Sequence, residues 1–178
     1  MKNELQKWFL YFVGATLLFI ITYSIFGPKA KQINLQEIAF TSTNSSELYF
    51  KNMRSYFYDK EEREDARFML YRIGSRNDAL SFILVNNWLM DESYIIVESK
   101  YDNFSVEWHY ENETGIVKLD GENNRAHYIF AAELFEQLDR KADLWLLNSA
   151  TKIPFSEEEK ASLRNTLKDY FKLVGKLR

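Results

Sequence analysis

The sequence predicts an α+β fold, in which one domain with an antiparallel meander sheet and two C-terminal helices follows an N-terminal transmembrane helix. Three observations predict this arrangement. An uncharged apolar segment stands near the N-terminus, short runs of aromatic and β-branched residues fill the middle, and helical spacing of apolar residues takes over in the last third. Strands followed by helices are typical of an antiparallel sheet that is covered on one face.

The N-terminal segment runs from Trp8 to Gly27 and carries no charge between Lys7 and Lys29. A helix of about 20 residues extends about 30 Å, which is the thickness of the hydrocarbon core of a bilayer. Tyr23 and other large residues occupy the positions where signal-peptide cleavage requires small ones. We therefore expect an uncleaved signal anchor that crosses the membrane once.

The lysines around this segment are nearly balanced, because two precede it and two follow it. The N-terminal tail, residues 1–7, is short and the C-terminal part is large. This favours a tail on the cytoplasmic side of the membrane and a domain on the extracytoplasmic side. Residues 28–47 are expected to form a polar linker, and residues 48–178 the α+β domain.

Six runs in the middle of the chain are expected to form the strands of the meander, because turn-forming residues separate several of them. Residues 80–90 also fit helical spacing, so the pattern leaves both structures open there. The charged residues 60–65 (KEERED) are expected to form a solvated loop or helical turn. The expected strands are residues 48–58, 68–73, 80–90, 94–101, 104–110 and 116–119.

The last third predicts two helices and one strand. Residues 125–138 place apolar side chains on one helical stripe, and residues 144–147 form a short apolar run. Ser156 and Glu159 form a capping box that begins the second helix. The same order of elements also fits the alternative of a strongly curved sheet, similar to a pleckstrin-homology barrel, closed by a C-terminal helix.

Composition and motifs exclude several kinds of chemistry. The net charge of -3 gives no reason to expect a nucleic-acid partner. The chain has no cysteine, which excludes disulfides, thiolate metal sites and a cysteine nucleophile. Signatures of nucleotide-binding loops, serine hydrolases and HExxH metal sites are absent, so the sequence predicts no cofactor.

The candidate for chemistry is His109, in the alternating run NFSVEWHYENETG at residues 103–115. Glu107 and Glu111 lie two residues away on the same face of an extended strand, about 6–7 Å from it. Two carboxylates and an imidazole can share a metal ion or orient a general base. A metal site usually takes a further ligand from another element, so we favour the simpler interpretation of a solvated sheet face.

Two further features have a functional and a structural interpretation. Exposed aromatic residues beside Lys51 and Arg54, in YFKNMRSYFYD at residues 49–59, would form a binding patch, but a buried strand also explains them. A basic stripe on the last helix predicts either contact with an anionic surface or a solvated face. Its members are Lys160, Arg164, Lys168, Lys172 and Lys176.

An anchored domain without a catalytic motif most simply recruits something. The expected function is therefore a single-pass membrane-anchored binding or assembly module, whose partners are the bilayer and an unidentified protein. The alternatives are a membrane-anchored hydrolase or metal-dependent enzyme centred on His109, and a small-ligand binding domain.

Overall fold

The computed structural model of the chain describes residues 7–8, 11–16, 37–64, 67–73, 79–148 and 151–177. The chain divides into two compact units, Met1–Lys31 and Gln32–Arg178. Most of the expected span from Trp8 to Gly27 lies outside the described residues; within it, Trp8 and residues 11–16 are helical. Among the residues that are described, no helix is both long enough and apolar enough to cross a membrane.

The second unit is an α+β fold with antiparallel sheets and few helices, as the sequence predicts. Its strands form two four-stranded sheets, in the orders β1-β2-β3-β4 and β6-β5-β7-β8. The bounds of the strands are β1 Asp59–Arg63, β2 Phe68–Arg72, β3 Leu80–Asn87, β4 Glu92–Ser99, β5 Ser105–Tyr110, β6 Glu113–Lys118, β7 Asp143–Leu147 and β8 Lys152–Pro154.

Helical elements open the unit, separate the strands of the second sheet and close the chain. The first is α2 (Asn44–Tyr49), which continues into a π-helical turn, η1 (Phe50–Arg54), and a 3₁₀ turn, η2 (Ser55–Phe57). Two longer helices follow, α3 (Asn124–Asp139) and α4 (Glu157–Leu173). The expected capping box at Ser156 and Glu159 is confirmed at the start of α4.

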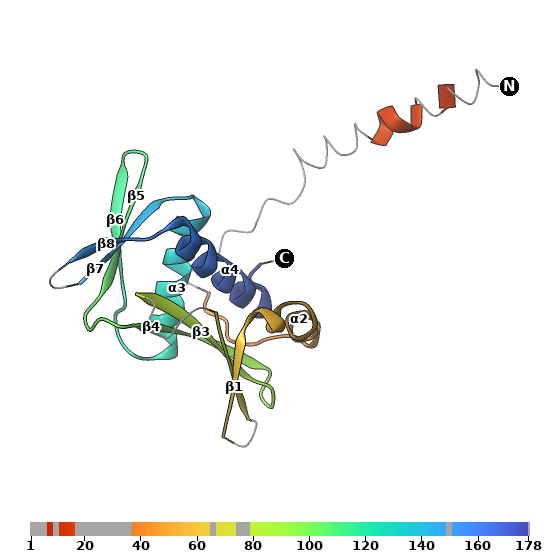
Figure 1. Cartoon of the computed structure of the whole chain (residues 1–178). Coiled ribbons are helices and arrows are strands. Elements are labelled where there is room, and N and C mark those ends of the chain that lie inside the picture. The colour runs from red at the N-terminus through yellow and green to blue at the C-terminus, as the bar shows by residue number, and fades with distance from the viewer. Residues whose placement is uncertain are drawn as a thin grey trace. The chain divides into compact units, whose positions relative to one another are not determined.

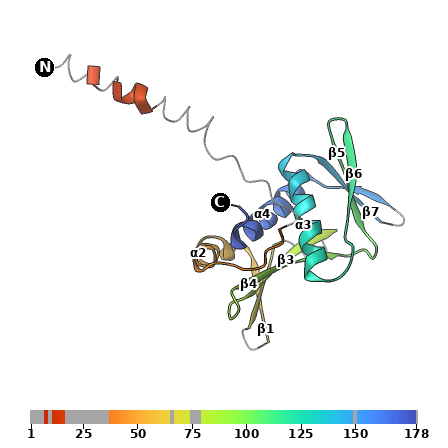
Figure 2. The same ribbon diagram turned by 180° about the vertical axis from the view of Figure 1, so that it is seen from behind.

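One hydrophobic core joins both sheets through α3. Helices α3 and α4 pack against each other and against the first sheet, and α3 also contacts β5 and β6 (Figure 1). Phe130 and Leu134 of α3 and Leu167 of α4 are fully buried in this core. The two views agree that α2 and the second sheet lie at opposite ends of the unit (Figures 1 and 2).

The prediction of one meander sheet is wrong in one respect, because the strands divide into two sheets. The first sheet is a meander, but β5 pairs with β6 and with β7, which follows α3 in the sequence. In neither sheet does the first strand pair with the last, so the described strands form no closed barrel. Pairing between distant strands depends on the tertiary fold and leaves no local pattern to detect.

Local structure differs from expectation in two places. Residues 48–57 are helical rather than a strand, because Thr43 and Ser46 form a capping box that starts α2. Residues 60–63 of the segment 60–65, expected as a loop or turn, belong to the edge strand β1, whose charged side chains disfavour pairing with another molecule. The open question at residues 80–90 is resolved as strand β3, in which every residue is buried.

Candidate functional site: an exposed aromatic face

Five large apolar side chains are exposed within residues 48–57, and we call this surface the aromatic face. Leu48 is 61% exposed, Tyr49 45%, Met53 57%, Tyr56 68% and Phe57 52%. Single exposed apolar residues are common on protein surfaces, whereas large contiguous groups of them are typical of interaction sites. This is the densest such group among the described residues of the second unit.

The irregular helix explains why these side chains face outward. The run carries apolar residues on all sides, so any helix built from it must expose some of them. Phe50, Ser55 and Tyr58 turn inward and are buried, which leaves the remaining aromatic residues outside. The π turn Phe50–Arg54 changes the helical phase between the exposed residues before it, Leu48 and Tyr49, and those after it, Tyr56 and Phe57. Such turns occur frequently at functional sites.

Polar contacts hold the inner side of this segment on α4. The Arg54 Nε lies 2.9 Å from both carboxylate oxygens of Asp169, and the Tyr58 hydroxyl donates to one of them at 2.7 Å. Burial, together with the negative charge of Asp169, raises the pKa of Tyr58. Ser46 Oγ also donates to the Leu173 carbonyl at 2.7 Å. The aromatic face is therefore presented by a docked element with fixed geometry.

The aromatic face carries cations but no carboxylate of its own. Residues 48–58 contain Lys51 and Arg54 and no Asp or Glu. Lys51 is exposed, while Arg54 stacks 4.8 Å from the centre of the Phe57 ring. From α4, the ammonium of Lys172 lies 5.6 Å from the centre of the Tyr49 ring. Asp169 pairs with Arg54, so Lys51 and Lys172 are the remaining cations beside the exposed rings, and Glu47 and the exposed Asp59 flank the segment.

From the sequence we favour a buried strand for this segment. The structure instead shows the alternative, an exposed patch. The signal that was available is the spacing of Tyr49, Met53 and Tyr56, which follows i, i+4 and i+7 on a helix. β-branched residues, which favour strands, are absent from residues 48–58.

At the second predicted site, His109 and Glu107 are brought together, but Glu111 is not. His109 Nε2 lies 2.6 Å from Glu107 Oε1, whereas Glu111 is exposed in the β5–β6 turn. Lys152 Nζ lies 2.8 Å from the other oxygen of Glu107, and Lys152 and then His109 lower the pKa of Glu107. The ring of His109 contacts that of Trp145, and the two ring centres lie 4.6 Å apart.

This cluster lies on a half-exposed face of the second sheet. One oxygen of Glu107 contacts the His109 imidazole and the other contacts the Lys152 ammonium. Across the described parts of the chain, no group of three or more His, Asp or Glu side chains is placed to hold a metal ion.

The predicted basic stripe on α4 is largely paired with acidic groups. Lys160 contacts Glu157 and Asp143, Arg164 contacts Asp139 at 2.5 Å, and Lys176 contacts Glu37 at 3.2 Å. Lys172 lies over Tyr49, and Lys168 is exposed. The stripe therefore does not form one continuous basic surface, and its last turn belongs to the surroundings of the aromatic face.

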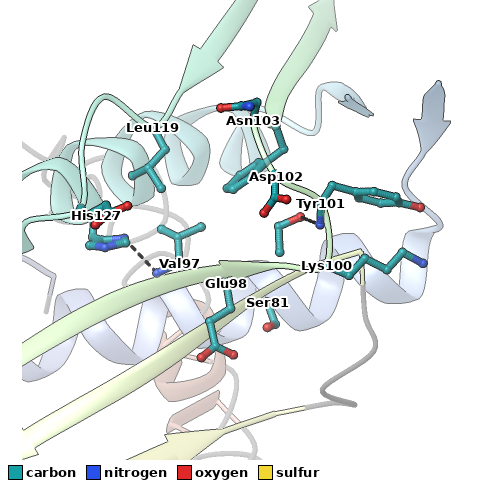
Figure 3. A pocket seen from close by; sticks show the side chains of 12 residues that line it. Ser81, Val97, Glu98, Lys100, Tyr101, Asp102, Asn103, Leu119 and His127 are labelled. Atoms are coloured by element: carbon teal, nitrogen blue, oxygen red, sulfur yellow. Dashed lines mark hydrogen bonds between the residues drawn. The ribbon is translucent and has the colours of Figure 1, made fainter. Parts of the chain in front are cut away.

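A pocket of about 510 Å³ lies between the end of β4 and the start of α3, lined by residues that include Val97, Asp102, Leu119 and His127 (Figure 3). The His127 ring nitrogen that faces β4 is not free to bind a ligand. This nitrogen, Nδ1, accepts a hydrogen bond from the Val97 N–H at 3.1 Å. Glu98, which also lines the pocket, pairs with Arg72.

Comparison with known protein families, with characterised proteins and with solved structures gives no match for this chain.

Proposed function

We propose that the chain is a single-pass membrane-anchored binding module. The segment from Trp8 to Gly27 is the anchor, and the α+β unit presents the aromatic face for binding on the extracytoplasmic side. The observation that carries the binding role is the group of five exposed apolar side chains, held in place by the contact between Arg54 and Asp169. The length and the uncharged composition of the N-terminal segment support the anchor.

The anchor is tested by membrane fractionation of the full-length chain. We expect the chain to remain with membranes after carbonate extraction. Replacing Leu18 and Ile20 by Lys should release it, because a lysine at the centre of a span costs about 2.5–3.5 kcal/mol on the insertion scale. A matched pair of lysines at Leu89 and Met90, which are exposed in the folded unit, should not. Recovery of the unmodified chain in the soluble fraction would disprove the anchor.

The binding role is tested by a photo-crosslinking side chain at Tyr56 in the full-length chain, in the cells that produce it. A binding surface should give more crosslinked product, to protein or to lipid, at Tyr56 than at Ile116, which is 51% exposed on β6 at the opposite end of the unit. Equal labelling at both positions would mean that the aromatic face is ordinary surface.

A further inference from the structure

We infer that the aromatic face lies against the lipid bilayer that holds the chain's own anchor, at the boundary between headgroups and acyl chains. This inference rests on the proposed function and names the partner of the same surface. Three properties of the face support it: its composition, its charge and its position relative to the point where the chain enters the folded unit.

The composition is that of a surface which lies partly in lipid. Leu48, Met53 and Phe57 are apolar to the tip, while Tyr49 and Tyr56 combine an apolar ring with a hydroxyl. Tyrosine rings with a polar tip are enriched where headgroups meet acyl chains. Apolar side chains that enter this boundary from a short helical element give interfacial binding in proportion to their buried area.

The charge of the face also fits a bilayer. No carboxylate lies within residues 48–58, although the whole chain has a net charge of -3. Lys51 lies within the segment and Lys172 lies over Tyr49, while Glu47 and Asp59 stand just outside its two ends. The long lysine side chains can reach the headgroups while the neighbouring rings enter the apolar layer. Lysine side chains next to anionic headgroups strengthen such binding, and the effect weakens with added salt.

The length of the chain allows the face to reach the membrane. Ten residue steps from Gly27 to Glu37 cover at most about 35 Å even when fully extended. Glu37 pairs with Lys176 just beyond the end of α4, and Ser46 of α2 bonds to Leu173 in the last turn of α4. The chain therefore enters the folded unit at the same end of α4 on which the aromatic face is docked.

This arrangement orients the whole unit. With the aromatic face on the bilayer, the second sheet points away from it, because α2 and that sheet lie at opposite ends (Figures 1 and 2). The cluster of Glu107, His109, Trp145 and Lys152 would then face the aqueous phase.

The test uses the absence of cysteine in the chain, which allows one label at a chosen position. Asn52→Cys places an environment-sensitive fluorophore within the aromatic face and leaves its five apolar side chains in place. Asn112→Cys places the same label in the β5–β6 turn as the matched control. The full-length chain is reconstituted at one copy per nanodisc, in phosphatidylcholine with phosphatidylserine and with lipids that carry a nitroxide quencher near the headgroup.

We expect several-fold stronger quenching of the label at position 52 than at position 112. Replacing Tyr56 and Phe57 together by Ser should remove the difference. Lys51→Glu should reduce quenching at position 52 in discs with phosphatidylserine and have less effect in phosphatidylcholine alone. Circular dichroism of each labelled chain confirms that the fold is retained.

Each contrary result overturns a different statement. A chain that enters the nanodisc but shows equal quenching at both positions disproves the inference and leaves the anchor intact. A chain that fails to enter the nanodisc disproves the anchor and the inference together. A further sample holds two copies per nanodisc. If the label at position 52 is shielded from water only in that sample, and without quenching by lipid, a second copy of this chain occupies the face instead of lipid.

Discussion

His127 shows how one buried side chain makes stability depend on pH. Its Nδ1 accepts a hydrogen bond from the Val97 N–H, which requires the neutral ring. Burial lowers the pKa of His127, and a hydrogen bond to the Glu122 backbone opposes this effect only partly. The folded state therefore binds this proton less readily than the unfolded state does.

The resulting prediction is that the folded unit loses stability as the pH falls below about 6.5, the ordinary pKa of histidine. The contribution of His127 is fully present above that pH and is lost as the pH falls through the lowered pKa of the folded state. Denaturant unfolding between pH 8 and pH 5 measures this loss. His127→Gln should therefore reduce the pH dependence. An unchanged pH dependence in this variant would contradict the assignment.

Gly115 matters because the Trp108 indole covers it across the β5–β6 pair. A Cβ at Gly115 would lie 2.7 Å from atoms of that indole. We therefore predict that Gly115→Val destabilises the unit by about 1–3 kcal/mol, because the ring must move to make room. In a Trp108→Ala background the same change should cost much less, and a double-mutant cycle by thermal unfolding measures the difference. Equal costs in both backgrounds would show that the ring does not lie on Gly115.

At the scale of elements, the segment α2–η2 depends on its buried ion pair with α4. The side chain of Asp169 is 5% exposed and that of Arg54 is 26% exposed. We predict that Asp169→Ala destabilises the unit by about 3 kcal/mol, at the low end for a broken buried pair because Arg54 can turn toward water. The change also removes the acceptor of the Tyr58 hydroxyl.

The matched control is the ion pair between Arg164 of α4 and Asp139 at the end of α3. Both of its side chains are about half exposed, at 45% and 51%. Asp139→Ala should therefore cost under about 1 kcal/mol. Denaturant unfolding compares the two variants, and a cost for Asp169→Ala as small as this would mean that the pair does not hold the segment in place.

For the whole molecule, the shared core predicts that both sheets unfold together. Val106 and Leu146 of the second sheet belong to the same buried cluster as Phe82 of the first, with α3 between them. Fluorine-labelled tryptophan distinguishes the ends of the unit, because Trp88 follows β3 and Trp145 lies in β7. In a denaturant titration of residues 32–178 their native NMR signals should disappear at the same midpoint. Loss of one signal before the other would mean that the two sheets unfold independently.

The sequence by itself determined the elements whose signals are local. The period of apolar residues and the capping box at Ser156 set α4, and alternating or continuous apolar runs set strands β2 to β7 within a few residues. These features depend on contacts within one element, so neighbouring residues contain the information. Composition likewise excluded disulfides and thiolate metal sites, because the chain has no cysteine.

Tertiary structure alone decided how these elements combine. It divided the strands into two sheets through the pairing of β5 with β7, placed the neutral His127 against Val97, and gave residues 48–57 a buried and an exposed side. Each of these features depends on partners far away in the sequence, such as Asp169 for Arg54. The spacing within YFKNMRSYF favours a helix, but which of its apolar side chains become buried depends on the surface it packs against, because the hydrophobic effect is non-directional and rewards the burial of any of them.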